Sequence, residues 1–128
     1  MLPHALVALA ILQSPAQFDL VCSGSVTEGG SRGQAYIERF RVDLDANRWC
    51  RGACERAFDI HEVTADRIVF AEIEPEARGT RVRSWLQVDR TSGDLDDYYS
   101  SVGRTVSRER RRAVCEPAPF SGLPTARF

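Results

Sequence analysis

Apolar and polar residues alternate along most of the chain, beginning with Phe18, Leu20 and Cys22, which share one face of an extended segment. A period of two predicts half-buried β-strands. The pattern returns at Phe40 and Val42 and in several later segments, which are separated by turns rich in Gly, Asp and Asn. The predicted strands cover residues 18–24, 39–44, 49–50, 58–60, 67–73, 81–88 and 95–102.

About seven short strands with no long helical pattern predict an all-β fold. We expect an antiparallel meander closed as a small β-barrel, with a β-sandwich as the alternative, because closure removes exposed sheet edges. Residues 67–73 are apolar enough to form a central strand, and residues 105–115 fit either a last strand or a short helix. Residues 116–128 contain three prolines and a glycine, which predicts an extended, docked tail.

The N-terminal segment differs from the rest of the chain. Residues 1–16 contain no Asp, Glu, Lys or Arg, and Ala5 to Leu12 form an unbroken apolar run followed by Ser14 and Ala16. A short apolar run before small residues is typical of a secretory signal peptide. A buried N-terminal helix is the alternative. We therefore expect a signal peptide over 1–16, a single domain over 17–128 and a periplasmic or secreted protein.

The four cysteines, Cys22, Cys50, Cys54 and Cys115, all lie in the expected mature domain. An even number in a short exported chain indicates disulfides. Gly52 lets the chain curl between Cys50 and Cys54, so we favour that pair, which leaves Cys22 with Cys115. A zinc site using Cys50, Cys54, His61 and Cys115 is the alternative, but the spacing lacks a second matching ligand pair.

Composition and motifs exclude several function classes. The formal net charge is −1, which gives no global field for nucleic acid, and all 17 basic residues are Arg. His61 has no nucleophile motif beside it, and Asp94 and Asp96 lie on the opposite strand face from Asp97, so no catalytic or metal-binding set converges. We expect no enzyme activity, no cofactor, no metal and no integral membrane insertion.

One segment suggests a binding surface. If residues 105–115 form a strand, Arg108, Arg110 and Arg112 make a one-sided stripe suited to an acidic or phosphate-rich partner. Aromatic residues that line a ligand mouth in small barrels form the second part of this candidate face. The candidates are Trp49, Trp85, Tyr98 and Tyr99.

The sequence Phe-Asp-Leu-Val-Cys-Ser-Gly at residues 18–24 resembles the start of small periplasmic lysozyme inhibitors. The resemblance covers only these residues and implies a disulfide-bearing β-barrel. No inhibitory residues carry over from it. We expect a non-catalytic binding module of the cell envelope, whose partner is an envelope protein or a small ligand. Inhibition of an extracytoplasmic hydrolase, such as a lysozyme, is the alternative function.

Overall fold

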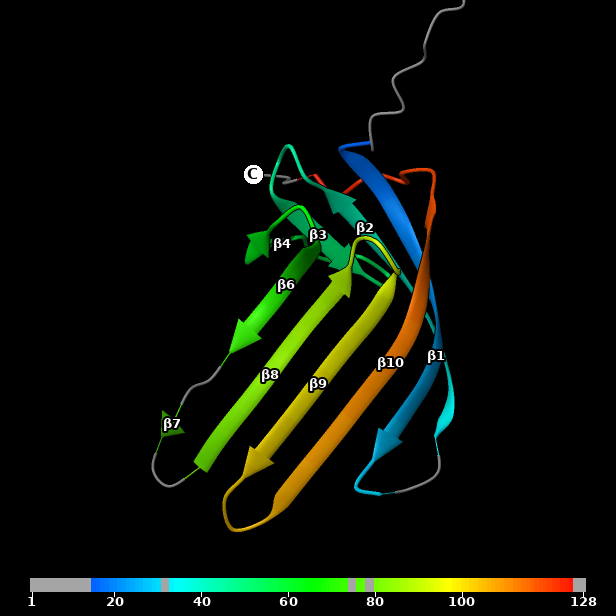
Figure 1. Ribbon diagram of the computed structural model, residues 1–128. Coiled ribbons are helices and arrows are strands. Elements are labelled where there is room, and N and C mark those ends of the chain that lie inside the picture. Colours follow the sequence, from blue (N-terminus) through cyan, green and yellow to red (C-terminus); the bar gives the residue numbers. More distant parts are fainter. Residues whose placement is uncertain (1–14, 31–32, 74–75, 78–79, 126–128) are drawn as a thin grey trace, which may run out of the picture.

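All described strands of the protein belong to one antiparallel sheet (Figure 1). The structure is a computed structural model that describes residues 15–30, 33–73, 76–77 and 80–125. Its ten strands are β1 (Gln17–Glu28), β2 (Gln34–Asp43), β3 (Arg48–Arg51), β4 (Phe58–Asp59), β5 (Glu62–Val63), β6 (Arg67–Ile73), β7 (Glu76–Ala77), β8 (Thr80–Asp89), β9 (Asp94–Val102) and β10 (Val106–Ala118).

Nine strands follow one another in the order β4-β3-β2-β1-β10-β9-β8-β6-β5, and β7 pairs with β8. The sheet curls into a half-barrel. The all-β prediction is therefore confirmed, whereas the predicted closed barrel and the predicted number of about seven strands are wrong. Closure requires the two edge strands to pair side by side. The edge strands here have two residues each and follow one another in the chain through Ile60 and His61. The two edge strands, β4 and β5, therefore do not pair with each other, and the sheet stays open.

A short segment nevertheless links the two edges at one end of the half-barrel. The backbone N–H of Ile60 donates to Asn47 beside β3, and that of His61 donates to Phe70 on β6. Ile60 is buried in the core between them.

No helix among the described residues is long and apolar enough to cross a membrane.

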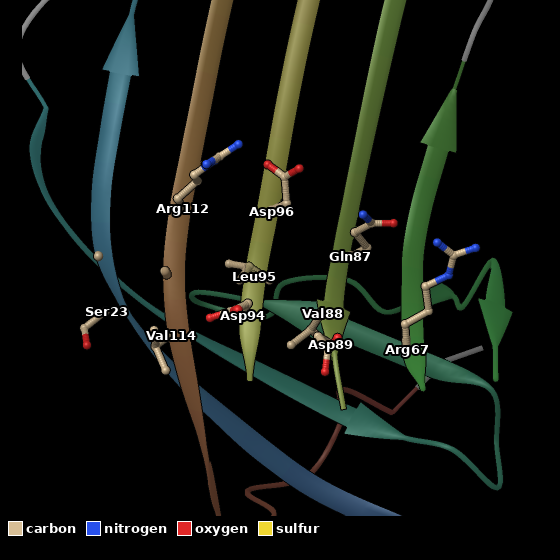
Figure 2. A pocket seen from close by; sticks show the side chains of 12 residues that line it. Ser23, Arg67, Gln87, Val88, Asp89, Asp94, Leu95, Asp96, Arg112 and Val114 are labelled. Atoms are coloured by element: carbon tan, nitrogen blue, oxygen red, sulfur yellow. The ribbon is translucent and has the colours of Figure 1, made fainter. Parts of the chain in front are cut away.

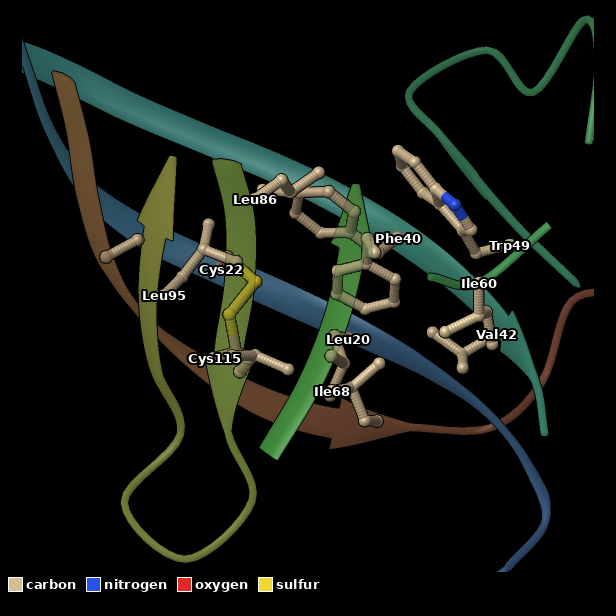
Figure 3. Close-up of a cluster of buried hydrophobic side chains, with 13 residues drawn as sticks. Leu20, Cys22, Phe40, Val42, Trp49, Ile60, Ile68, Leu86, Leu95 and Cys115 are labelled. Carbon is tan, nitrogen blue, oxygen red and sulfur yellow. A yellow bond between two sulfur atoms is a disulfide. The ribbon is translucent and has the colours of Figure 1, made fainter. Parts of the chain in front are cut away.

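The core lies on the concave side of the sheet, where the alternating apolar residues converge (Figure 3). The ring of Phe40 stacks on Phe70 with centroids 5.7 Å apart, and Trp49 packs against Phe70 at 5.0 Å. A β-bulge between Val69 and Ala71 adds Phe70 to β6, and its side chain is buried. Aromatic packing of this kind stabilises a fold beyond its area burial.

Both predicted disulfides are present. Cys22 pairs with Cys115 across the registered strands β1 and β10, and Cys50 pairs with Cys54. With all four cysteines oxidised, the alternative zinc set is excluded. The first bridge joins neighbouring strands in the middle of the sheet, so it does not connect the two edges.

The C-terminal segment differs from the prediction in one respect. Residues 105–115 form a strand and not a helix, and β10 continues through Glu116 and Pro117 to Ala118. The extended tail therefore begins after Ala118. Ser121 holds it on β1 by donating from its N–H and its hydroxyl to the Asp19 carboxylate. Of the predicted signal peptide over 1–16, all but residues 15 and 16 lie outside the described residues.

Candidate functional site: a cationic face on the convex side

Three neighbouring strands assemble an arginine-rich surface opposite the core. Their pairing places alternate residues of β8, β9 and β10 in rows on the convex side of the sheet. We call the nine residues of three successive rows the cationic face. The rows are Arg81–Val102–Val106, Arg83–Ser100–Arg108 and Trp85–Tyr98–Arg110. Four of the nine are arginines and none is acidic.

Aromatic stacking holds the third row in place. Trp85 and Tyr98 stack with ring centroids 4.4 Å apart and an interplanar angle of 27°. The Arg110 guanidinium lies 5.5 Å from the Tyr98 ring centroid, and that of Arg83 lies 5.8 Å from Trp85. Cation–π contacts of this kind attract the guanidinium to the ring face. The two arginines and two rings therefore form one ordered ladder on the sheet.

Asp96, in the row beyond the cationic face, holds the side chains of Arg110 and Trp85 in position. Its carboxylate accepts two hydrogen bonds from Arg110, at 2.9 and 3.0 Å, and one from the Trp85 indole N–H at 3.0 Å. Burial opposes ionisation of Asp96, but the hydrogen bonds from Arg110 and Trp85 outweigh it and lower its pKa. Asp96 is thus ionised at neutral pH and neutralises Arg110. The other arginines of the cationic face are Arg81, Arg83 and Arg108.

The β9–β10 hairpin ends this surface with exposed apolar groups. Val102 and Val106 pair directly with each other and are 38% and 61% exposed. Gly103, Arg104 and Thr105 connect them, and Arg104 is exposed. The end of the hairpin therefore combines aliphatic side chains with a guanidinium, adjoining the arginines of the cationic face.

A separate hollow of about 630 Å³ lies on the convex side, beyond Asp96 (Figure 2). Arg112, Asp96, Gln87 and Arg67 project from β10, β9, β8 and β6 on the same side of the sheet. Both signs of charge line the hollow, with Asp89 and Asp94 among the other lining residues. A mixed lining with no excess of positive charge distinguishes it from the cationic face.

The sequence-predicted binding residues are divided between three environments. Arg108, Arg110, Trp85 and Tyr98 come together on the cationic face, and Arg112 lies one row beyond, beside Asp96. Tyr99 points to the opposite, concave side. Trp49 lies in the core, 5% exposed, where its indole N–H donates to the Asp59 carbonyl, so it is not part of an exposed face.

The concave side holds an ion cluster that the sequence pattern did not predict. The Arg51 guanidinium donates to the carboxylates of Glu38, at 2.5 and 2.8 Å, and Asp97, at 2.9 Å. The Tyr36 hydroxyl donates to Glu38 and accepts from Arg51. Arg111 pairs with Asp97 at 3.5 Å and also with Glu109.

The pKa shifts in this cluster stabilise its charged form. Burial opposes ionisation of Glu38, but hydrogen bonds from Arg51 and Tyr36 outweigh it and lower the Glu38 pKa. Burial and the neighbouring Glu38 raise the pKa of the Tyr36 hydroxyl. Glu38 therefore stays ionised and Tyr36 neutral around pH 7, which suits a structural ion network and gives no group poised to exchange a proton.

His61 and the acidic residues offer no metal centre among the residues that the structure describes. His61 lies 3.8 Å from the Glu72 carboxylate, with both side chains about half exposed.

Comparison with protein-family models, curated proteins and solved structures found no match.

Proposed function

We propose that this protein is an exported, non-catalytic binding module that holds an anionic component of the cell envelope on its cationic face. One observation carries the proposal. The register of β8, β9 and β10 gathers four arginines, a tryptophan and a tyrosine on nine adjacent positions that include no carboxylate. Guanidinium groups bind phosphate and carboxylate in a bidentate geometry, and they stay charged at every physiological pH.

The proposed function places the protein in the periplasm or outside the cell. Two disulfides are consistent with an oxidising, extracytoplasmic environment. The molecule has a net charge near zero, so it has no long-range field of its own. A local cluster of arginines then determines which surface meets an anionic partner, because opposite charges attract most strongly over distances within a Debye length.

The test is retention on immobilised inorganic polyphosphate, which presents the phosphate chemistry without any lipid. The variant Arg83→Gln/Arg108→Gln removes two charges that face each other across Ser100. We expect it to elute at clearly lower salt than the wild-type protein, because each lost phosphate contact reduces the salt dependence of binding. The matched control, Arg56→Gln/Arg67→Gln, removes two charges that lie outside the cationic face and should elute like the wild type. Equal elution of the two variants would refute the proposal.

A further inference from the structure

We propose that the hollow beyond Asp96 is a second binding site, which takes a short peptide with a free amino end and a free carboxyl end. The inference goes beyond the proposed function, because this hollow lies outside the cationic face. One observation carries it: the guanidinium of Arg112 and the carboxylate of Asp94 line the same hollow of about 630 Å³. Within the part of the chain that the structure describes, neither side chain takes part in a hydrogen bond or a salt bridge.

Arg112 keeps its hydrogen-bond donors because the neighbouring carboxylate is already used. Its cross-strand partner is Asp96. The Asp96 oxygens accept two hydrogen bonds from Arg110 and one from Trp85. Arg112 extends toward Asp96 and away from Asp94 (Figure 2). Two guanidinium groups therefore share one carboxylate, which leaves one positive charge in excess on this side of the hollow.

The neighbouring row of the sheet carries one negative charge in excess. Asp89 accepts hydrogen bonds from two backbone N–H groups of its own turn. Its register partner on β6 is Arg67, so one positive charge lies beside the two negative charges of Asp89 and Asp94. The hollow as a whole is thus balanced, with a cationic group and an anionic group in separate places.

The shape of the hollow fits a peptide of about two residues. Its floor is backbone, because Gly24 has no side chain and the side chains of Ala113 and Leu95 belong to the core on the other side of the sheet. Arg112 and Asp94 are diagonal neighbours on β10 and β9, about 7–8 Å apart. An extended peptide advances about 3.3–3.6 Å per residue, so a dipeptide spans the same distance.

The charges of the hollow select a ligand that carries both signs. A guanidinium binds a carboxylate through two parallel hydrogen bonds, and a carboxylate accepts hydrogen bonds from an ammonium group. A ligand that is only anionic meets three carboxylates in the hollow, and one that is only cationic meets two guanidinium groups. The Gln87 amide and the Ser23 hydroxyl also line the hollow and can hydrogen-bond to the peptide group of the ligand.

The experiment is a two-dimensional NMR titration of the isotope-labelled protein with dialanine at constant ionic strength. Dialanine should shift the backbone amide signals of Gly24, Ala113 and Leu95 in a saturable way at millimolar concentrations. Acetyl-dialanine lacks the amino charge and dialanine amide lacks the carboxylate. Each should bind about fivefold more weakly, which corresponds to the loss of one exposed ion pair.

Two variants assign the two ends of the ligand. Asp94→Asn should bind dialanine about fivefold more weakly and no longer distinguish it from acetyl-dialanine. Arg112→Gln should weaken binding by the same factor and no longer distinguish dialanine from its amide. The matched controls, Asp45→Asn and Arg104→Gln, change exposed residues outside the hollow and should bind like the wild type. Urea unfolding establishes that each variant is folded.

Three outcomes would overturn the proposal. The first is the absence of any saturable shift with the wild-type protein. The second is equal binding of dialanine and its two blocked forms. The third is unchanged discrimination by Asp94→Asn and Arg112→Gln, which would place the ligand elsewhere on the molecule. None of these outcomes bears on polyphosphate retention, because Asp94 and Arg112 do not belong to the cationic face.

Discussion

Asp19 is a buried carboxylate on the outer side of β1, and its replacement by asparagine tests how the C-terminal tail is held. The side chain is completely buried. Its oxygens accept hydrogen bonds from the Ser121 N–H at 3.1 Å, the Ser121 hydroxyl at 2.6 Å and the Arg39 Nε at 2.5 Å. These contacts cover the carboxylate with the tail on one side and with β2 on the other.

The free energy lost in Asp19→Asn follows from these three contacts. A hydrogen bond to a charged group contributes about 1.5–3 kcal/mol. The asparagine oxygen still accepts one of the bonds, and the Arg39 side chain is half exposed, so water screens its ion pair. We therefore expect a decrease in the free energy of unfolding of about 2–3 kcal/mol at pH 7.

The pH dependence of this loss provides the stricter test. Burial opposes ionisation of Asp19, but the bonds from Ser121 and Arg39 outweigh it and lower its pKa below the ordinary 3.8. A lowered folded-state pKa contributes stability that is fully present above the unfolded-state pKa, about 3.9, and is lost as the pH falls through the folded-state value. The difference between Asp19→Asn and the wild type should therefore be constant above about pH 5 and shrink below pH 4.

Urea unfolding followed by tryptophan fluorescence, repeated at intervals from pH 7 to pH 3, measures this difference. Asp66→Asn, at an exposed turn, is the control and should leave stability unchanged. Ser121→Ala combined with Asp19→Asn completes a double-mutant cycle, in which the two changes should be strongly non-additive. A difference below 0.5 kcal/mol at pH 7, or the same difference at pH 7 and pH 3, would refute the reasoning.

Two further predictions concern the β1–β10 pair and the disulfides. Cys22→Ser/Cys115→Ser opens a loop with a sequence separation of 93 and should lower the free energy of unfolding by about 4–5 kcal/mol. Cys50→Ser/Cys54→Ser opens a separation of only 4 and should lower it by about 2 kcal/mol. Equal losses for the two variants in urea unfolding would contradict the chain-entropy estimate. Gly24→Ala should lower the free energy of unfolding by about 2–3 kcal/mol, because its Cβ would lie 1.9 Å from a backbone carbonyl oxygen of β10. A melting temperature equal to that of the wild type would contradict this, since it would mean that β1 and β10 move apart without loss of stability.

Alternation along the chain predicted the strands that carry the core, and the limits of that prediction have physical causes. Phe40 and Val42 are buried as expected, but β2 begins at Gln34, five residues before the predicted strand. Residues 67–73 are apolar on both faces, yet β6 pairs with β8 along its length and with β5 at two residues only. Whether a sheet closes depends on pairing between its edges, which spacing along one strand does not encode.

The candidate site was predictable only in part for a similar reason. The stripe of Arg108, Arg110 and Arg112 follows from period two alone once the segment is a strand. Its meeting with Trp85 and Tyr98 depends on the register of three strands, which two hairpin turns set. Tyr98 and Tyr99 are adjacent in sequence and lie on opposite sides of the sheet, so aromatic composition by itself did not identify the face.

The ion cluster gives the half-barrel a second cross-connection, in addition to the segment around Ile60 that links its edges. Arg51 belongs to β3 near one edge, whereas Asp97 belongs to β9 on the far side of the curl, 46 residues away in sequence. Tyr36 and Glu38 continue the inward positions of Phe40 and Val42 along β2, so polar residues replace apolar ones where the core ends. Charged hydrogen bonds across the concave side then stabilise the curvature, since they hold the two walls at a fixed separation. The convex side is thereby held in shape, and the three rows of the cationic face keep a constant geometry.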